Sequence, residues 1–168
     1  MPNHVKEEAA LEPITVEELP WNEWSHGVRY GGRSRRLSDT REGVGLRIGV
    51  VVEELPPGKQ SCPFHYHLLE EEHILMLEGE VTLRLGEQRR RFSAGQFVSF
   101  PAGVQRGHCL VNEGEAPARY LVIGDRNPNE VCIYPDSGNL MVRGFAGSVF
   151  KHGPKVDYWD GEKADEVL

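Results

Sequence analysis

Six short apolar runs, each bounded by turn-forming residues, are the feature that most constrains the fold of this chain. The runs have strand length and are rich in β-branched or aromatic residues: 46–55 (LRIGVVVEEL), 73–77 (HILML), 81–85 (VTLRL), 97–100 (FVSF), 108–112 (HCLVN) and 119–123 (RYLVI). Apolar and polar residues alternate in several of them, so each strand presents one face to a core. This pattern predicts an all-β sandwich or barrel.

The length of 168 residues suits one domain with a single core. We expect the barrel to span residues 46–135, with an N-terminal extension over 1–45 and a C-terminal tail over 136–168. Three aromatic residues, Trp21, Trp24 and Tyr30, are unusual for a disordered segment. We therefore expect the extension to pack on the barrel or on a second subunit, and expect a short helix only near 6–12.

Charge and cysteine content narrow the choice of partners. The net charge of −7 argues against broad contact with nucleic-acid phosphates or with an anionic membrane surface. The chain shows no apolar run of about 18 residues, as a membrane helix requires, and no signal-peptide pattern at its start, so we expect a cytoplasmic location. Cys62, Cys109 and Cys132 are widely spaced and predict neither a disulfide framework nor a zinc knuckle.

Candidate metal ligands lie in two segments, 58–80 and 95–112. His65 and His67 are two residues apart, so both imidazoles project from the same face of a strand. The polar run 68–72 (LLEEE) can bend the chain and bring Glu72 onto a neighbouring strand that faces the pair. His108 lies on a further short strand, which a barrel can bring to the same interior point.

Three imidazoles and one carboxylate favour a borderline divalent metal such as Mn, Fe, Co, Ni or Zn. Four protein ligands on an octahedral ion leave two positions for water or substrate, which is a catalytic arrangement. Neutral histidines and one carboxylate leave a net positive site that attracts an oxygen-rich or anionic small molecule. We interpret the neighbouring Glu70 and Glu71 as solvated turn carboxylates, with a role for either as a general base as the less favoured alternative. No catalytic residue is assigned.

The spacing of these residues resembles the paired motifs of the cupin superfamily. The first motif comprises Gly58, His65, His67, Glu72 and Gly79, and the second comprises Gly95, Pro101, Gly103, His108 and Asn112. Two spacings are longer than usual, with six residues between Gly58 and His65 and four between Gly103 and His108. Arg106 stands where the fourth ligand is usually found. His108 is favoured because its spacing to Asn112 fits and because a protonated arginine cannot bind a metal.

The resemblance implies a small single-domain cupin of the conserved-barrel type, a double-stranded β-helix or jelly roll. Residues 119–139 and 157–162 resemble a subgroup of small bacterial cupins often described as sugar-phosphate isomerases, which implies a metal-dependent isomerase. Because one fold hosts many reactions, an Fe(II)-dependent dioxygenase and a non-enzymatic module that binds or senses a small ligand stay open as alternatives. We also expect a homodimer, since open sheet edges invite pairing with a second chain.

Overall fold

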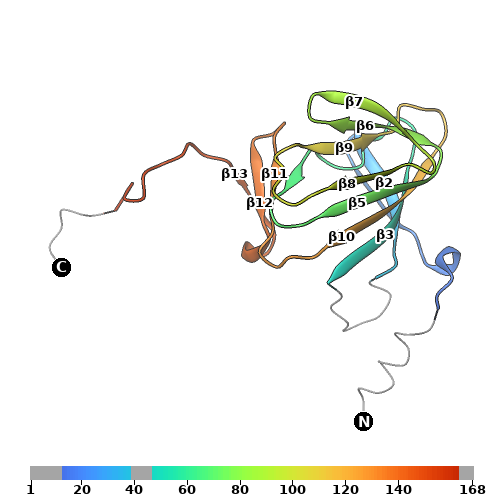
Figure 1. The fold of residues 1–168 in the computed structure, drawn as a ribbon, viewed down its shortest axis with the longest axis horizontal. Coiled ribbons are helices and arrows are strands. Elements are labelled where there is room, and N and C mark those ends of the chain that lie inside the picture. The colour runs from blue at the N-terminus through green and yellow to red at the C-terminus, as the bar shows by residue number, and fades with distance from the viewer. Residues whose placement is uncertain (1–12, 39–46, 163–168) are drawn as a thin grey trace, which may run out of the picture.

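The computed structural model describes residues 13–38 and 47–162, and the regular secondary structure of this part of the chain consists almost entirely of β-strands (Figure 1). Two short 3-10 helices accompany them, η1 (Val16–Glu18) and η2 (Arg143–Phe145). The helix expected near 6–12 lies outside the described residues. The strands are β1 (Asn22–His26), β2 (Tyr30–Arg36), β3 (Ile48–Leu55), β4 (Tyr66–His67), β5 (Glu72–Glu78), β6 (Glu80–Leu85), β7 (Gln88–Ser93), β8 (Phe97–Phe100), β9 (His108–Val111), β10 (Ala118–Asp125), β11 (Val131–Tyr134), β12 (Asn139–Val142) and β13 (Ser148–Lys151).

Within the described residues the strands form three antiparallel sheets. The largest has the order β1-β2-β3-β10-β5-β8, and a smaller sheet has the order β7-β6-β9. The third sheet, β13-β12-β11-β4, closes one end of the barrel (Figure 1). The all-β fold class predicted from the sequence is confirmed, and each of the six predicted apolar runs contains a strand within the described residues.

The apolar core fills the space between the six-stranded and the three-stranded sheet. Its buried side chains come from both sheets: Leu55, Ile74, Met76, Phe100, Ala118 and Tyr120 from the first, and Val81, Leu83, Phe92 and Leu110 from the second. Burial of a side chain such as leucine contributes about 1.5–3 kcal/mol. This core therefore supplies the rigid frame on which the residues at the barrel end are held.

Strand β5 shows how alternation positions a functional side chain. Ile74 and Met76 are buried in the core, whereas Leu77 is exposed on the opposite side. Glu72, at the start of the strand, shares the inward face with Ile74 and Met76 because side chains alternate along a strand. The residues between β4 and β5 form the bend that the polar run predicted. The carboxylate of Glu72 therefore lies at the inner end of the barrel.

The described part of the N-terminal extension packs on the barrel of its own chain. Strand β1 pairs with β2, and β2 continues the large sheet by pairing with β3. The ring of Trp21 lies against the guanidinium groups of Arg33 and Arg35, at 4.5 and 4.1 Å from the ring centroid. The carboxylate of Glu54 accepts hydrogen bonds from both Arg33 and Arg119 at 2.8 Å. These contacts tie β2 to β3 and β10.

Residues beyond the main barrel are also ordered into strands. Strands β11, β12 and β13 form a meander, and the short strand β4 pairs with β11 through the register His67 to Cys132. Among the described residues, no helix has the length and apolarity needed to cross a membrane.

Candidate metal centre

The structure brings together the four side chains that the sequence predicts as metal ligands. The Nε2 atoms of His65 and His67 lie 3.1 Å apart. The carboxylate oxygens of Glu72 lie 3.3 Å from Nε2 of His108 and 3.7 Å from Nε2 of His67. Donor atoms that each lie about 2.1 Å from one ion can be at most about 4.2 Å apart. These three separations are within that limit, and donor atoms of His65, Glu72 and His108 all lie within 4.8 Å of one another.

Backbone pairing places the histidines next to one another. His65 and His108 form an isolated antiparallel bridge, in which His65 N donates to His108 O (3.2 Å) and His108 N donates to His65 O (2.8 Å). His67 follows two residues later on β4, so its ring lies on the same side as that of His65, with the ring centroids 4.9 Å apart. The inward-facing Glu72 of β5 completes the group.

The long spacing before His108 is absorbed by the loop between β8 and β9. The Arg106 guanidinium donates to Leu85 O (3.4 Å) and to the side chain of Gln88 (3.1 Å), so it does not lie among the four donors. The ring of His108 is only 2% exposed and stacks on Phe100 with 3.6 Å between centroids. His108, rather than the arginine at the usual spacing, is the side chain that meets Glu72.

Hydrogen bonds at the Nδ1 atoms fix the orientation and the tautomer of two of the imidazole rings, those of His65 and His67. His65 Nδ1 lies 2.9 Å from Pro63 O, and because a carbonyl only accepts, Nδ1 must carry the proton. His67 Nδ1 lies 3.2 Å from a carboxylate oxygen of Glu130 and donates in the same way. Neutral rings in these tautomers turn two Nε2 lone pairs toward each other at 3.1 Å. Such a pairing suits a shared cation, and outward N–H groups held by acceptors are typical of metal-binding histidines.

Burial and mutual charge set the protonation of the cluster. Burial, with the neighbouring His108 next, lowers the pKa of His65 to about 4. For His67, burial alone would lower the pKa, but the hydrogen bond and charge of Glu72, followed by Glu130, raise it. Burial would raise the pKa of Glu72, but hydrogen bonds with His108 and His67 hold that pKa well below its usual range. The carboxylate is therefore ionised and His65 is neutral near pH 7, as metal ligation requires.

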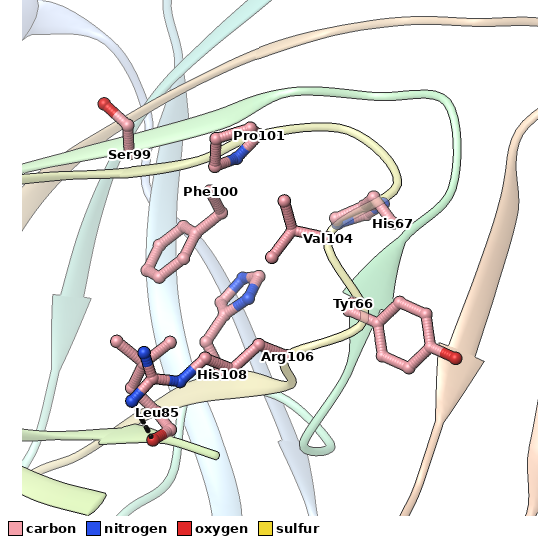
Figure 2. Close-up of a pocket in the computed structure, with 9 residues that line it drawn as sticks. All are labelled: Tyr66, His67, Leu85, Ser99, Phe100, Pro101, Val104, Arg106 and His108. Carbon is pink, nitrogen blue, oxygen red and sulfur yellow. Dashed lines mark hydrogen bonds between the residues drawn. The ribbon is translucent and has the colours of Figure 1, made fainter.

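A cleft opens onto two of the four side chains. Nine residues line it: Tyr66, His67, Leu85, Ser99, Phe100, Pro101, Val104, Arg106 and His108. In the view of Figure 2, the rings of Phe100, His67 and His108 surround the side chain of Val104, while the Ser99 hydroxyl is directed away. Ser99 instead contacts His73 on the outer face, at 3.0 Å. A small molecule in this cleft would meet mostly apolar walls, the two histidines and Arg106.

Residues 51–124 match the cupin domain family. The chain contains a cupin domain. This chain is 28% identical to a solved structure of a sugar phosphate isomerase of the cupin superfamily from Silicibacter pomeroyi. The alignment covers 83% of this chain and 92% of that chain, with a TM-score of 0.74. A proposed sugar phosphate isomerase from Acidithiobacillus ferrooxidans is 26% identical over 82% of this chain and 89% of that chain, with a TM-score of 0.73.

A curated relative is similar over part of its length. Over 94 residues, which are 55% of this chain, the sequence is 32% identical to the tetracenomycin polyketide synthase protein TcmJ of Streptomyces glaucescens. The match spans 60% of the length of that protein. The cupin resemblance predicted from the paired motifs, and the similarity to sugar phosphate isomerases predicted from residues 119–139 and 157–162, are confirmed.

Two buried carboxylates beside the cupin centre were missed or misread by sequence reasoning. Glu130, which precedes β11, is fully buried and accepts from His67 Nδ1. Glu70 was interpreted as a solvated turn residue, but this is wrong: its carboxylate is buried, pairs with Arg143 and accepts from Asn127 N at 2.6 Å. The neighbouring Glu71 is exposed, as expected. No spacing pattern links Glu70 to Arg143 or His67 to Glu130, because these contacts cross more than 60 residues.

The thiols near the cupin centre are expected to be unreactive in the folded protein. Burial raises the pKa of Cys109 to about 11 and that of Cys132 to about 12. Only about one Cys109 side chain in a thousand is then a thiolate at pH 8. We predict that a disulfide reagent modifies both residues at least about 100-fold more slowly in native protein than in urea, followed residue by residue by mass spectrometry. Fast labelling of either residue in the native state would contradict the burial described here.

Proposed function

We propose that His65, His67, Glu72 and His108 bind one divalent transition metal (Mn, Fe, Co, Ni or Zn), and that the protein is a metal-dependent enzyme acting on a small oxygen-rich substrate. The observation that carries this proposal is the convergence of three imidazole nitrogens and one carboxylate, two of them at the surface of a cleft. A metal held by these four side chains and able to take further ligands would offer positions for oxygen atoms of a substrate.

Isomerisation of a sugar or sugar phosphate is the reaction that the relatives support best. Two solved structures that carry this name align with more than 80% of the chain. A divalent ion held by His65, His67, Glu72 and His108 would supply a Lewis acid for this reaction, able to stabilise negative charge that develops beside a substrate carbonyl. Arg106 lines the same cleft and offers a charge-assisted contact for a phosphate group.

The residues of the chain itself hold the donors in place and keep water away. Pro63 O and Glu130 hold the rings of His65 and His67 with Nε2 directed at the centre. Phe100 covers one face of the His108 ring. Apolar walls strengthen every electrostatic interaction at the floor of the cleft, because they lower the local dielectric constant.

The lining of the cleft favours a second candidate, a substrate with two adjacent oxygens on a largely apolar body. Leu85, Phe100 and Val104 cannot accept or donate hydrogen bonds to sugar hydroxyls. A hydroxyl buried without a partner costs about 1–3 kcal/mol by mutational data. The name of the relative TcmJ, a polyketide synthase protein, supports this candidate, because polyketides are a class of compound different from sugars.

Metal binding itself is expected to stabilise the fold. A metal that binds only the native state at 100 times its dissociation constant adds about 2.7 kcal/mol of stability. We therefore predict that at least one of the five metals raises the melting temperature of the metal-free protein, measured by scanning calorimetry, and that a chelator reverses the rise. No shift with any of the five would contradict the proposed site.

The reaction is tested with metal-loaded protein on a substrate panel, in air and under argon. The panel contains pentose and hexose phosphates, free sugars and an apolar 1,2-diketone, with products followed by NMR. Isomerisation at the same rate with and without oxygen would support the proposal. Oxygen consumption that is lost when zinc replaces iron would instead indicate the dioxygenase. Binding of panel compounds without turnover would indicate the ligand-binding module.

A further inference from the structure

A fully buried carboxylate lies directly behind one of the proposed metal ligands. Glu130, in the segment between β10 and β11, is 0% exposed. One of its oxygens accepts from Leu68 N (3.1 Å) and from His67 Nδ1 (3.2 Å), and the other accepts from Leu69 N (3.0 Å). Three N–H groups thus surround one carboxylate, and because a carboxylate only accepts, His67 Nδ1 is the donor in its contact.

These contacts fix both the position and the tautomer of His67. Because Nδ1–H donates to Glu130, the lone pair of the neutral ring is on Nε2, the atom that faces His65 and Glu72. The two backbone bonds lock the chain on the C-terminal side of His67 to the same carboxylate. A negative charge behind the ring also makes Nε2 a stronger donor to a metal.

The second buried carboxylate beside His67, that of Glu70, forms its hydrogen bonds with other residues. An oxygen of Glu70 lies 3.8 Å from His67 Nδ1, beyond hydrogen-bond distance. Both Glu70 oxygens contact the Arg143 guanidinium, and one also accepts from Asn127 N. Glu70 therefore offers a comparison: a second buried carboxylate near His67 that does not form a hydrogen bond with this ring.

We propose that Glu130 is the positioning residue of the metal centre, fixing the ring of His67 so that Nε2 points to the ion. This inference rests on the proposed function, since it assigns His67 as a ligand. Glu130 lies outside residues 51–124, the segment that matches the cupin domain family. The positioning group is thus supplied by the part of the chain that follows the family segment.

The test compares Glu130→Gln with Glu70→Gln, using Co²⁺ and Zn²⁺ as probes. The dissociation constants are measured by competition with a chelator. Loss of an outer-shell partner typically weakens metal binding by 10–100-fold. We expect a weakening of about 10–100-fold for Glu130→Gln and of less than about threefold for Glu70→Gln, with a changed Co²⁺ absorption spectrum only in the first. Equal weakening in both variants, or less than about threefold in Glu130→Gln, would overturn the proposal.

A tautomer measurement keeps the inference independent of metal binding and of the folding of any variant. In metal-free wild-type protein with ¹⁵N-labelled histidine at about pH 9, His67 should show the Nδ1–H tautomer, in contrast to the Nε2–H form that is favoured in water. The Nε2–H form in wild type would overturn the role of Glu130. Absence of metal binding by wild type would instead overturn the proposed function while leaving the tautomer result to decide the role of Glu130.

A double-mutant cycle separates positioning from a general effect on the fold. If Glu130 acts through His67, then Glu130→Gln should change the metal affinity by less than about twofold in a His67→Ala background. Full additivity of the two substitutions would show that Glu130 acts by another route.

Discussion

Replacing His108 by alanine is expected to abolish stoichiometric metal binding. The imidazole supplies one of four proposed donors, and its Nε2 faces Glu72 at 3.3 Å in a nearly fully buried position. Its loss should weaken metal affinity by more than about 100-fold, beyond the 10–100-fold typical of an outer-shell partner. The metal-to-protein ratio after gel filtration, measured by elemental analysis, checks this. His67→Ala should behave in the same way.

His73→Ala provides the matched control. This histidine directly follows Glu72 in sequence but lies on the outer face of β5, where Nδ1 contacts the Ser99 hydroxyl at 3.0 Å and the ring stacks on Phe97. Its removal should leave the metal content at the wild-type value. Unchanged metal content in His108→Ala and His67→Ala, with both variants folded by circular dichroism, would show that the assigned site is wrong.

Replacing Asn112 by alanine is expected to cause a large loss of stability without touching the metal donors. The Asn112 side chain is completely buried; Nδ2 donates to Leu55 O (2.8 Å) and Ala116 O (2.9 Å), and Oδ1 accepts from Gly114 N (3.0 Å). Buried backbone groups left without a partner cost about 1–3 kcal/mol each. We expect the free energy of unfolding to fall by about 2–4 kcal/mol, measured by urea denaturation of the metal-free protein.

An exposed asparagine serves as the comparison for this substitution. Asn129 lies in the turn before β11, and its side chain is exposed. Asn129→Ala should change the free energy of unfolding by no more than about 0.5 kcal/mol. A loss below about 1 kcal/mol in Asn112→Ala would mean that the three bonds of this amide do not hold the end of β3 against the 112–116 turn.

Sequence patterns predicted the strands and the placement of His65 and His67 on one face because both depend on local spacing. Alternation in the runs around Ile74 and Leu83 directly reports which face is buried, and the HxH spacing requires two imidazoles on one face. The bend that brings Glu72 to them follows from a polar run between two apolar ones. These features need no knowledge of distant parts of the chain.

Features that depend on long-range pairing could not be predicted in the same way. Strands β1 and β2 lack a clean apolar alternation, and β1 is exposed throughout, so the packing of Trp21 on arginine side chains is visible only in the fold. Strand β7, with its three consecutive arginines, is likewise exposed along most of its length. The burial of Glu70 depends on Arg143, and the role of Glu130 depends on His67, and neither partner is marked by a motif.

The two-residue strand β4 has a practical consequence for anyone who trims or transplants this domain. Strand β4 is held by β11, whose residues Cys132 and Ile133 lie beyond the family segment. A fragment cut to residues 51–124 would retain all four donor side chains but lose β11, the strand with which the backbone of His67 pairs. Grafting of this centre onto another scaffold therefore has to include the chain at least to Tyr134, the end of β11.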